Sequence, residues 1–248
     1  MSLATEFRYS AIVPVYRHEA ASRHVVEELA RHGLHVFLVD DGNTLEGHQI
    51  LKQIANDIPH TTLITHKVNG GKGKAVCSGL KYAYKAGFTH ALQVDADGQH
   101  DLGAVPFFIE KSREHPKDLI CAYPKYDASV PKAREQGRKI TNFWVTLETL
   151  STRIPDSMCG FRMYPLKSVW PVAKKIRNYR MGFDIEILVK LSWKNVYMRF
   201  FPLKVNYPED GISNFRMFHD NVAISLTHAK LFCGMLFRLP LILSRKIF

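Results

Sequence analysis

Two carboxylates follow an apolar run in the middle of the chain. Asp95 and Asp97 come directly after residues 91–94, and Gly98 and Gln99 follow them. Side chains alternate across an extended strand, so the two aspartates point to the same side of it. Two carboxylates and the amide carbonyl of Gln99 suit a hard divalent cation, Mg or Mn, that keeps open positions for phosphate oxygens. The same Asp-x-Asp-Gly pattern is also common turn chemistry, so these residues alone leave both a metal site and a surface turn open.

A glycine- and lysine-rich segment, residues 68–74, is the second candidate group. A P-loop requires Ser or Thr after its lysine, but Ala75 follows Lys74, and a dinucleotide fingerprint would follow the first strand of the chain. Both patterns fail. The remaining interpretation is a flexible loop whose Lys72 and Lys74, at the start of a helix, can lie near a diphosphate. A solvated basic turn is the alternative.

The elements that position these groups alternate between strand and helix. Apolar runs predict strands, followed in turn by helices, and these strands and helices cover 10–16, 17–33, 35–39, 44–57, 61–65, 75–86 and 89–94. This alternation predicts an α/β fold with a mostly parallel, Rossmann-like sheet flanked by helices. Ligands bind such sheets at the carboxyl ends of the strands. Tyr16, the Asp40–Asp41 pair, the Gly-Lys segment and Asp95 with Asp97 all fall at such ends, which favours a functional site over isolated turns.

The second half of the chain is less regular. Helices are expected over 103–115, 132–153 and 182–193, and strands over 119–123 and 196–205. The long helix carries Arg134 and Arg138 on one face, and the helix over 182–193 contains Asp184 and Glu186.

Composition limits the possible partners and the compartment. The 248 residues carry a net charge of +11, which indicates an anionic partner: nucleic acid, a phosphorylated substrate or a membrane surface. Nucleic acid is disfavoured, because no basic stripe with interleaved aromatic residues is present. The cysteines are widely spaced and predict reduced thiols. No signal peptide is expected, and no uncharged run approaches the ~20 residues that a spanning helix needs.

Five segments together resemble one known family. They occur in family order at residues 13–16, 39–42, 69–73, 94–100 and 156–162. The chain resembles the family 2 glycosyltransferases of the GT-A fold, and within them the dolichyl- and polyprenyl-phosphate sugar synthases. The resemblance covers about residues 10 to 215. It implies an inverting transfer of one sugar from a nucleotide-diphosphate sugar, assisted by a divalent metal.

The resemblance also assigns roles to individual residues. Pro14 and Tyr16 would shape the nucleobase pocket, and Asp40 or Asp41 would contact the nucleoside. The metal ligands would be Asp95, Asp97 and Gln99. Asp156 and residues 160–162 would line the acceptor side. The cations that could stabilise the leaving diphosphate are Lys72, Lys74, Arg134 and Arg138.

The acceptor determines whether a catalytic base is needed. A phosphate acceptor needs none, because its second pKa is about 6. A hydroxyl acceptor needs one, and Asp156, Asp184 and Glu186 are candidates, although Asp184 and Glu186 also suit a structural role on their helix.

The chain departs from the family pattern near the end of the catalytic region. The polyprenyl-phosphate enzymes carry an arginine and a lysine around a Gly-x-Ser, but Pro208 and Asn214 occupy those places here. The expected acceptor is therefore a lipid of some kind, with polyprenyl phosphate as the alternative. A non-catalytic lipid-binding scaffold is the remaining possibility.

The expected domains are a catalytic unit over 1–214 and an amphipathic helical tail over 215–248. On a single helix, the tail cations Arg216, Lys230, Arg238 and Arg245 fall within about a quarter of the circumference. This pattern predicts a helix lying in the membrane interface, and Pro240 should break or kink it. A tail packed on the core is the alternative. The expected location is peripheral, on the cytoplasmic side of the inner (plasma) membrane.

Overall fold

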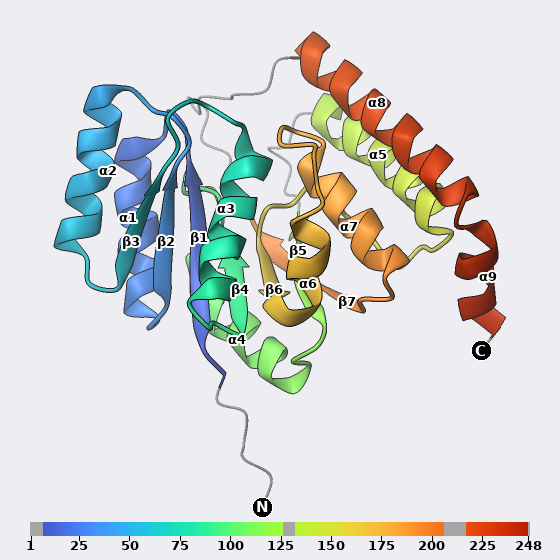
Figure 1. The fold of residues 1–248 in the computed structure, drawn as a ribbon, viewed down its shortest axis with the longest axis horizontal. Helices are drawn as coiled ribbons and strands as arrows, with labels where there is room; N and C mark the ends of the chain where they lie inside the picture. Colours follow the sequence, from blue (N-terminus) through green and yellow to red (C-terminus); the bar gives the residue numbers. More distant parts are fainter. Residues whose placement is uncertain (1–6, 126–131, 206–216, 248) are drawn as a thin grey trace, which may run out of the picture.

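A seven-stranded sheet forms the centre of the molecule (Figure 1). The structure is a computed structural model that describes the backbone of residues 7–125, 132–205 and 217–247, and side chains over 7–125, 136–205 and 219–245. The strands, in sheet order, are β3 (Thr61–Thr65), β2 (His35–Asp40), β1 (Tyr9–Val15), β4 (His90–Gln93), β6 (Arg162–Pro165), β5 (Leu119–Lys125) and β7 (Met198–Lys204). In this described sheet β6 runs antiparallel to β4 and β5, and the other neighbours are parallel. The predicted mostly parallel α/β sheet is confirmed.

Helices cover both faces of this sheet. They are α1 (Glu19–Arg31), α2 (Leu45–Asp57), α3 (Lys72–Lys85), η1 (Leu102–Ala104), α4 (Val105–Glu114), α5 (Lys132–Thr149), α6 (Leu166–Ala173), α7 (Phe183–Trp193), α8 (Met217–Leu236) and α9 (Leu239–Ile247). Alternation along β1 explains the two layers. Ala11 and Val13 pack with residues of α1, α2 and α4, whereas Ile12 packs with residues of α3, α6 and α7.

The chain reverses its direction across the sheet between β1 and β4. From β1 it builds outward through β2 to β3, and it then returns to place β4 on the other side of β1. The carboxyl ends of β1, β2 and β4 therefore meet at one edge, where α/β sheets bind ligands. Because β6 is antiparallel, its first residue, Arg162, pairs with Gln93 at the end of β4. The segment before β6 is thereby brought to the same edge.

Several predicted boundaries were wrong. The helix expected over 75–86 begins at Lys72, so Lys72 and Lys74 lie in the first turn of α3 and not in a loop. Gly71 starts this helix with φ +91°, and a Cβ there would lie 2.4 Å from the carbonyl oxygen of Tyr179, a contact that the sequence pattern does not reveal. The helix expected over 132–153 ends at Thr149, where Leu150 takes a positive φ. Helix α6, which starts directly after β6 and contains an internal proline, was missed.

The tail forms two helices, as the break or kink expected at Pro240 allows: α8 ends at Leu236 and α9 begins at Leu239, one residue before that proline. α8 and α9 are bent by 71° at a short break. One face of α8 packs against α5 and α7 (Figure 1), where it buries Ile224, Leu231 and Met235. In the described part of the chain, no single helix is long and apolar enough to cross a membrane, whereas α8 and α9 taken together meet that test by length and composition. The expected domain boundary at 214/215 lies outside the described residues, and the division into two domains stays a prediction.

Candidate active site

Lys72 joins two carboxylates at the carboxyl edge of the sheet. Its Nζ lies 2.8 Å from Oδ1 of Asp95, donates to Oδ2 at 3.0 Å, and lies 3.2 Å from Oδ2 of Asp184. Burial opposes the charge of Lys72, but Asp184 and Asp95 outweigh it and raise the pKa of the ammonium group. Burial likewise opposes the charge of Asp95, but Lys72 outweighs it and holds the pKa of that carboxyl below its usual value. Lys72 and Asp95 are therefore both charged at neutral pH.

A buried network holds Asp184 from the opposite side. Nη1 of Arg162 lies 3.2 Å from Oδ1 of Asp184 and also donates to the Asp184 backbone carbonyl at 3.1 Å. The Gln93 amide lies 3.4 Å from the same Oδ1, and the Tyr164 hydroxyl donates to Gln93 at 2.8 Å. Burial raises the pKa of Tyr164, so its hydroxyl stays protonated and serves as the donor. Asp184, predicted as a catalytic residue, is thus a shared anchor for two cations.

Gly160 lies directly against the Lys72–Asp95 pair. A Cβ built there would lie 2.5 Å from Oδ2 of Asp95 and 2.7 Å from Nζ of Lys72. Real Cβ atoms do not approach other atoms so closely, so any side chain at this position would have to displace the carboxylate of Asp95 and the ammonium group of Lys72. The predicted proximity of Gly160 to the site is explained by this contact.

Asp97 closes the turn after the strand. Its Oδ1 accepts the backbone N–H of Gln99 at 3.1 Å, and the Gln99 side chain as a metal ligand stays a prediction. His100 follows, and burial lowers its pKa against the opposing pull of Asp95 and Asp97. An uncharged imidazole therefore packs beside the carboxylates, with its ring against Phe161. The sequence reading assigned His100 no role.

The residues present fit a divalent metal that shares its coordination with a substrate. The described residues hold no group of three or more His, Cys, Asp or Glu side chains arranged for a metal. Mg²⁺ sites in phosphate-handling enzymes use one or two carboxylates together with substrate oxygens, and Asp95 and Asp97 supply that number. Oδ1 of Asp95 is buried and, despite the nearby Lys72, accepts no hydrogen bond of good geometry, so it is a ready ligand atom.

The charge balance at the site favours the same ligand class. Four carboxylates face three cations, namely Asp95, Asp97, Asp156 and Asp184 against Lys72, Arg138 and Arg162. A divalent cation would reverse this small negative excess and attract a diphosphate.

Asp40 and Asp41 are committed to the loops around them. Asp40 accepts from the backbone and side chain of Asn43 and pairs with His48 at 2.8 Å. Asn43 in turn donates to the Val15 carbonyl and accepts the N–H of Arg17. The loops after β1 and β2 are thereby tied together, and Asp40 shapes the edge of the site without presenting a free carboxylate.

Asp41 holds the Gly-Lys segment in the same way. Its carboxylate accepts the N–H groups of Gly70 and Gly71 at 3.0 and 2.7 Å, and also accepts from Asn69 and His66. Four donors fill the lone-pair sites of one carboxylate. Direct contact of Asp41 with a nucleoside stays a prediction, and it would require one of these bonds to yield.

Asp156 is fixed by an ion pair and a turn. Arg138 bonds to Oδ2, and Oδ1 accepts the N–H groups of Met158 and Cys159 at 3.0 and 2.7 Å. Arg138 therefore supports Asp156, and a place for either residue at the acceptor side stays a prediction. The side chain of Arg134 lies outside the described residues, although its backbone is in α5.

The remaining predicted residues divide between the site and its surroundings. Pro14 and Tyr16, both half-buried, lie at the end of β1, with Arg17 stacked on the Tyr16 ring. Lys74 packs along Gly70. Glu186 bonds to Lys190 one turn later on α7, which agrees with a structural role.

Comparison with known proteins identifies the family. The profile described as Glycosyl transferase family 2 matches residues 10–172. The match covers more than half of the chain, so the protein belongs to this family and is a glycosyltransferase.

Two curated relatives support the predicted branch. A UDP-N-acetylglucosamine–dolichyl-phosphate N-acetylglucosaminyltransferase of Methanococcus voltae is 26% identical over 215 residues, covering 80% of this chain and 85% of that protein. A dolichyl-phosphate beta-glucosyltransferase of Dictyostelium discoideum is 26% identical over 176 residues, covering 65% of this chain and 51% of that protein. The predicted resemblance to the polyprenyl-phosphate branch is confirmed.

Solved structures confirm the fold. Glucosyl-3-phosphoglycerate synthase from Mycobacterium tuberculosis, in complex with Mn²⁺ and uridine-diphosphate-glucose, aligns with a TM-score of 0.68 at 12% identity, over 92% of this chain and 79% of that one. A mannosyltransferase from Pyrobaculum calidifontis with GDP-Man and Mn²⁺ aligns with a TM-score of 0.61 at 14% identity, over 94% and 65%. The predicted GT-A fold is therefore correct.

Proposed function

We propose that the protein transfers a single sugar from a nucleotide-diphosphate sugar to a lipid-type acceptor at a membrane surface, with inversion at the anomeric carbon. The observation that carries this proposal is the cluster of Lys72, Asp95 and Asp184 at the carboxyl edge of the sheet, in a chain of the glycosyl transferase 2 family. The bound diphosphate sugars and Mn²⁺ of the structural neighbours support the donor class.

The donor's diphosphate would lie between the Asp-x-Asp turn and the first turn of α3. Asp95 and Asp97 would hold a divalent metal, which supplies Lewis-acid stabilisation of the leaving diphosphate. Lys74 has no ion pair with a described carboxylate and can turn to the diphosphate. Lys72 keeps Asp95 and Asp184 in place, so that the geometry exists before the donor arrives.

The paired carboxylates favour a phosphate acceptor over a hydroxyl. A general base must be able to take a proton in the reacting geometry. Asp156 is bonded by Arg138 and two N–H groups, and Asp184 by Lys72 and Arg162. A lipid phosphate needs no base, and two relatives are named for dolichyl-phosphate transfer. We therefore favour a lipid phosphate, although Pro208 and Asn214, which bear on this choice, lie outside the described residues.

An apolar face on the C-terminal side supports membrane association. Large apolar side chains are exposed on three adjacent helices, at Ile140 and Phe143 of α5, Leu226 of α8, Phe237 in the bend and Leu241 of α9. Figure 1 shows α5 and α8 side by side at one edge of the molecule, continued by α9. The proposed location remains peripheral, on the cytoplasmic side of the inner membrane.

The test is a transfer assay with matched acceptors. Purified protein is given UDP- and GDP-sugars with Mn²⁺ or Mg²⁺, and either a polyprenyl phosphate or the polyprenol of equal length. We expect transfer to the phosphate alone and a product of inverted anomeric configuration by NMR. Equal transfer to the polyprenol would restore the hydroxyl acceptor and a catalytic base. No turnover and no donor hydrolysis with any donor would leave the scaffold alternative.

A further inference from the structure

A pocket of about 840 Å³ lies outside the catalytic cluster. This open pocket is lined by the second half of α5, residues 150–154, the turn between α7 and β7, and α9. The lining includes none of Lys72, Asp95, Asp156 and Asp184. Its volume falls in the range of sites for small organic ligands. The reaction proposed above assigns no part to it.

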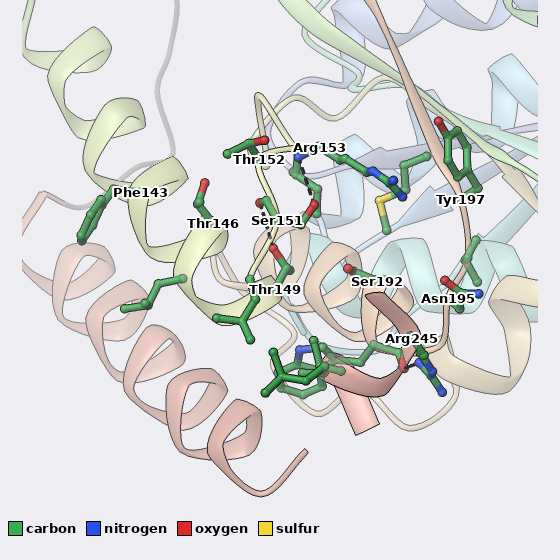
Figure 2. A pocket seen from close by; sticks show the side chains of 18 residues that line it. Phe143, Thr146, Thr149, Ser151, Thr152, Arg153, Ser192, Asn195, Tyr197 and Arg245 are labelled. Atoms are coloured by element: carbon green, nitrogen blue, oxygen red, sulfur yellow. Dashed lines mark hydrogen bonds between the residues drawn. The ribbon is translucent and has the colours of Figure 1, made fainter. Parts of the chain in front are cut away.

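The lining divides into an apolar wall and a cationic side. Trp193 and Ile242 are buried in the wall. Arg153 and Arg245 supply two positive charges, and no Asp or Glu lines the pocket. Figure 2 shows Arg153 beside Tyr197 and Arg245 lower in the view, below Asn195, with Phe143 at the opposite side of the picture from both. Ser151 and Ser192 add hydroxyl groups to the lining, whereas the Thr149 hydroxyl is already bonded to the Val145 and Ser151 carbonyls. The lining therefore complements a molecule with an anionic head and an apolar body.

Contacts within the protein position the two arginines of the cationic side. The Arg245 guanidinium donates to the carbonyl of Trp193, and the Arg153 guanidinium lies 5.6 Å from the Tyr197 ring centre. Ser151 accepts the Arg153 N–H at 3.2 Å. The bond to the Trp193 carbonyl uses one guanidinium nitrogen of Arg245, and Arg153 stacks on one face of the Tyr197 ring. Each guanidinium group carries five N–H donors. Donors therefore remain for a phosphate.

The pocket is continuous with the exposed apolar face. Phe143 and Leu243 line the pocket and are also exposed, by 65% and 44%. An acyl chain in the pocket could therefore leave it beside Phe143 and Leu243 and reach that face. This continuity selects a membrane lipid over a soluble anion.

We propose that this pocket binds one anionic phospholipid of the bilayer, with the phosphate on the side of Arg153 and Arg245 and an acyl chain against Trp193 and Ile242. The source of the ligand rests on the proposed membrane association. The site itself does not, because it can be tested in solution without a membrane and without turnover.

The test uses short-chain lipids below their micelle concentration. Trp144→Phe/Trp170→Phe leaves Trp193 as the single tryptophan of the three in the chain, and its fluorescence is titrated with dihexanoyl phosphatidylglycerol. We expect saturable binding, with dihexanoyl phosphatidylcholine weaker by about tenfold for the lost net charge. Inorganic phosphate should cause no change, because it lacks the apolar part. Equal binding of phosphatidylcholine, or displacement by phosphate at equal concentration, would overturn the proposal.

Substitutions that remove charge distinguish a specific lipid site from general electrostatic attraction of the lipid to the protein. Arg153→Gln/Arg245→Gln should weaken binding by at least about tenfold. Lys167→Gln/Lys230→Gln removes the same charge from exposed residues outside the lining and should change it by less than about twofold. Equal losses in both pairs would refute a specific site.

A blocking variant gives an independent reading. Ser192→Phe places a ring in the pocket and should abolish the fluorescence change on lipid titration. Thermal unfolding should stay cooperative. Unchanged lipid binding by this variant would also refute the site. Donor hydrolysis without lipid should be the same in all these variants, so that failure of the pocket and failure of the proposed reaction are read separately.

Discussion

At the scale of single residues, the site consists of charges that are already paired. Lys72 pairs with the carboxylates of Asp95 and Asp184, and Asp184 pairs with both Lys72 and Arg162. Such a network fixes its members before substrate binds, and removal of one member leaves another buried charge without its partner. Asp97 is the exception among the four carboxylates, because it has no ion pair with a Lys or Arg of the described residues and its hydrogen bond there is with the Gln99 backbone. It is therefore the cleanest position for testing the metal.

We predict that Asp97→Asn reduces transfer by roughly 10²-fold or more, because the substitution removes a charged ligand at the leaving group. The half-buried Asn keeps the shape and can still accept from Gln99, so thermal unfolding should be unchanged. Steady-state rates and a melting curve check both statements. Wild-type transfer that persists in excess chelator, or a fully active variant, would contradict the metal's role.

Gly160 provides a second test at this scale. Gly160→Ala would place a Cβ within 2.7 Å of both Asp95 and Lys72, so we expect kcat to fall by roughly 10²-fold as the pair is displaced. Gly137→Ala on α5 is the matched control, since no atom lies within 4 Å of its Cβ position and alanine favours the helix. Rates and unfolding are measured for both. Normal turnover by Gly160→Ala would show that the pair tolerates displacement.

The sequence identifies some of these residues and not others. Alternation along one strand suffices to place Asp95 and Asp97 together, because both belong to a single local pattern. The pairing of Arg162 with Asp184 depends on β6 running antiparallel beside β4, which no local pattern encodes. The sequence left Asp184 open as a base or a structural residue. Its pairing with Lys72 and Arg162 favours the structural role, and a catalytic role stays a prediction.

At the scale of elements, short segments carry the site to the sheet edge. Asp41 fastens the loop before α3, and Asp40 fastens the loops after β1 and β2. The strand–helix alternation of the first half was predictable because each βα unit has its own apolar period and its own stop. The second half was less predictable, because α6 follows β6 without a turn. The end of α5 also depends on the positive φ of Leu150, which the sequence does not indicate.

The junction of α5 and α8 contains a buried pair. Glu148 accepts from or donates to Nδ1 of His228 at 2.8 Å, and both side chains are buried. Burial raises the pKa of Glu148, against the opposing effect of His228. A carboxyl whose pKa is raised on folding binds its proton more tightly in the folded state. The stability that it contributes is therefore largest at low pH and is lost as the pH rises through the raised pKa.

We predict that His228→Leu lowers the unfolding free energy by about 3 kcal/mol at pH 8, because Glu148 is then buried without a partner. The deficit should shrink near pH 5, where Glu148 can take up a proton. Glu148→Leu/His228→Leu should be more stable than the single variant and should lack this pH dependence. Urea unfolding at the two pH values measures all three proteins. A deficit that grows as the pH falls would show that Glu148 is not the responsible group.

At the scale of the whole molecule, the tail has two different faces. The inner face of α8 and α9 is part of the core, with Leu231, Met235 and Ile242 buried. Deletion of the tail would therefore expose core surface and could not distinguish membrane binding from loss of structure. The outer face is suitable for substitution, because Phe237 is 88% exposed and Leu226 is 56% exposed. Helical periodicity predicted an amphipathic tail, but the bend that separates α8 from α9 redistributes its side chains.

We predict that Phe237→Ser/Leu226→Ser reduces binding to vesicles by about tenfold or more, because each large apolar side chain contributes about 1.5–3 kcal/mol when it leaves water. The fold should be kept, since exposed substitutions change stability by about 0.5 kcal/mol or less.

The control is Leu45→Ser/Tyr82→Ser, which removes two exposed apolar side chains from α2 and α3, away from the tail. Co-sedimentation with phosphatidylglycerol-containing vesicles, at low and high salt, measures all three proteins. If the outer face of the tail enters the bilayer, only the first pair loses binding, and the residual attraction is abolished by salt. Equal binding by both pairs and the wild type would place the membrane contact elsewhere, and it would leave the lipid acceptor without support from the surface.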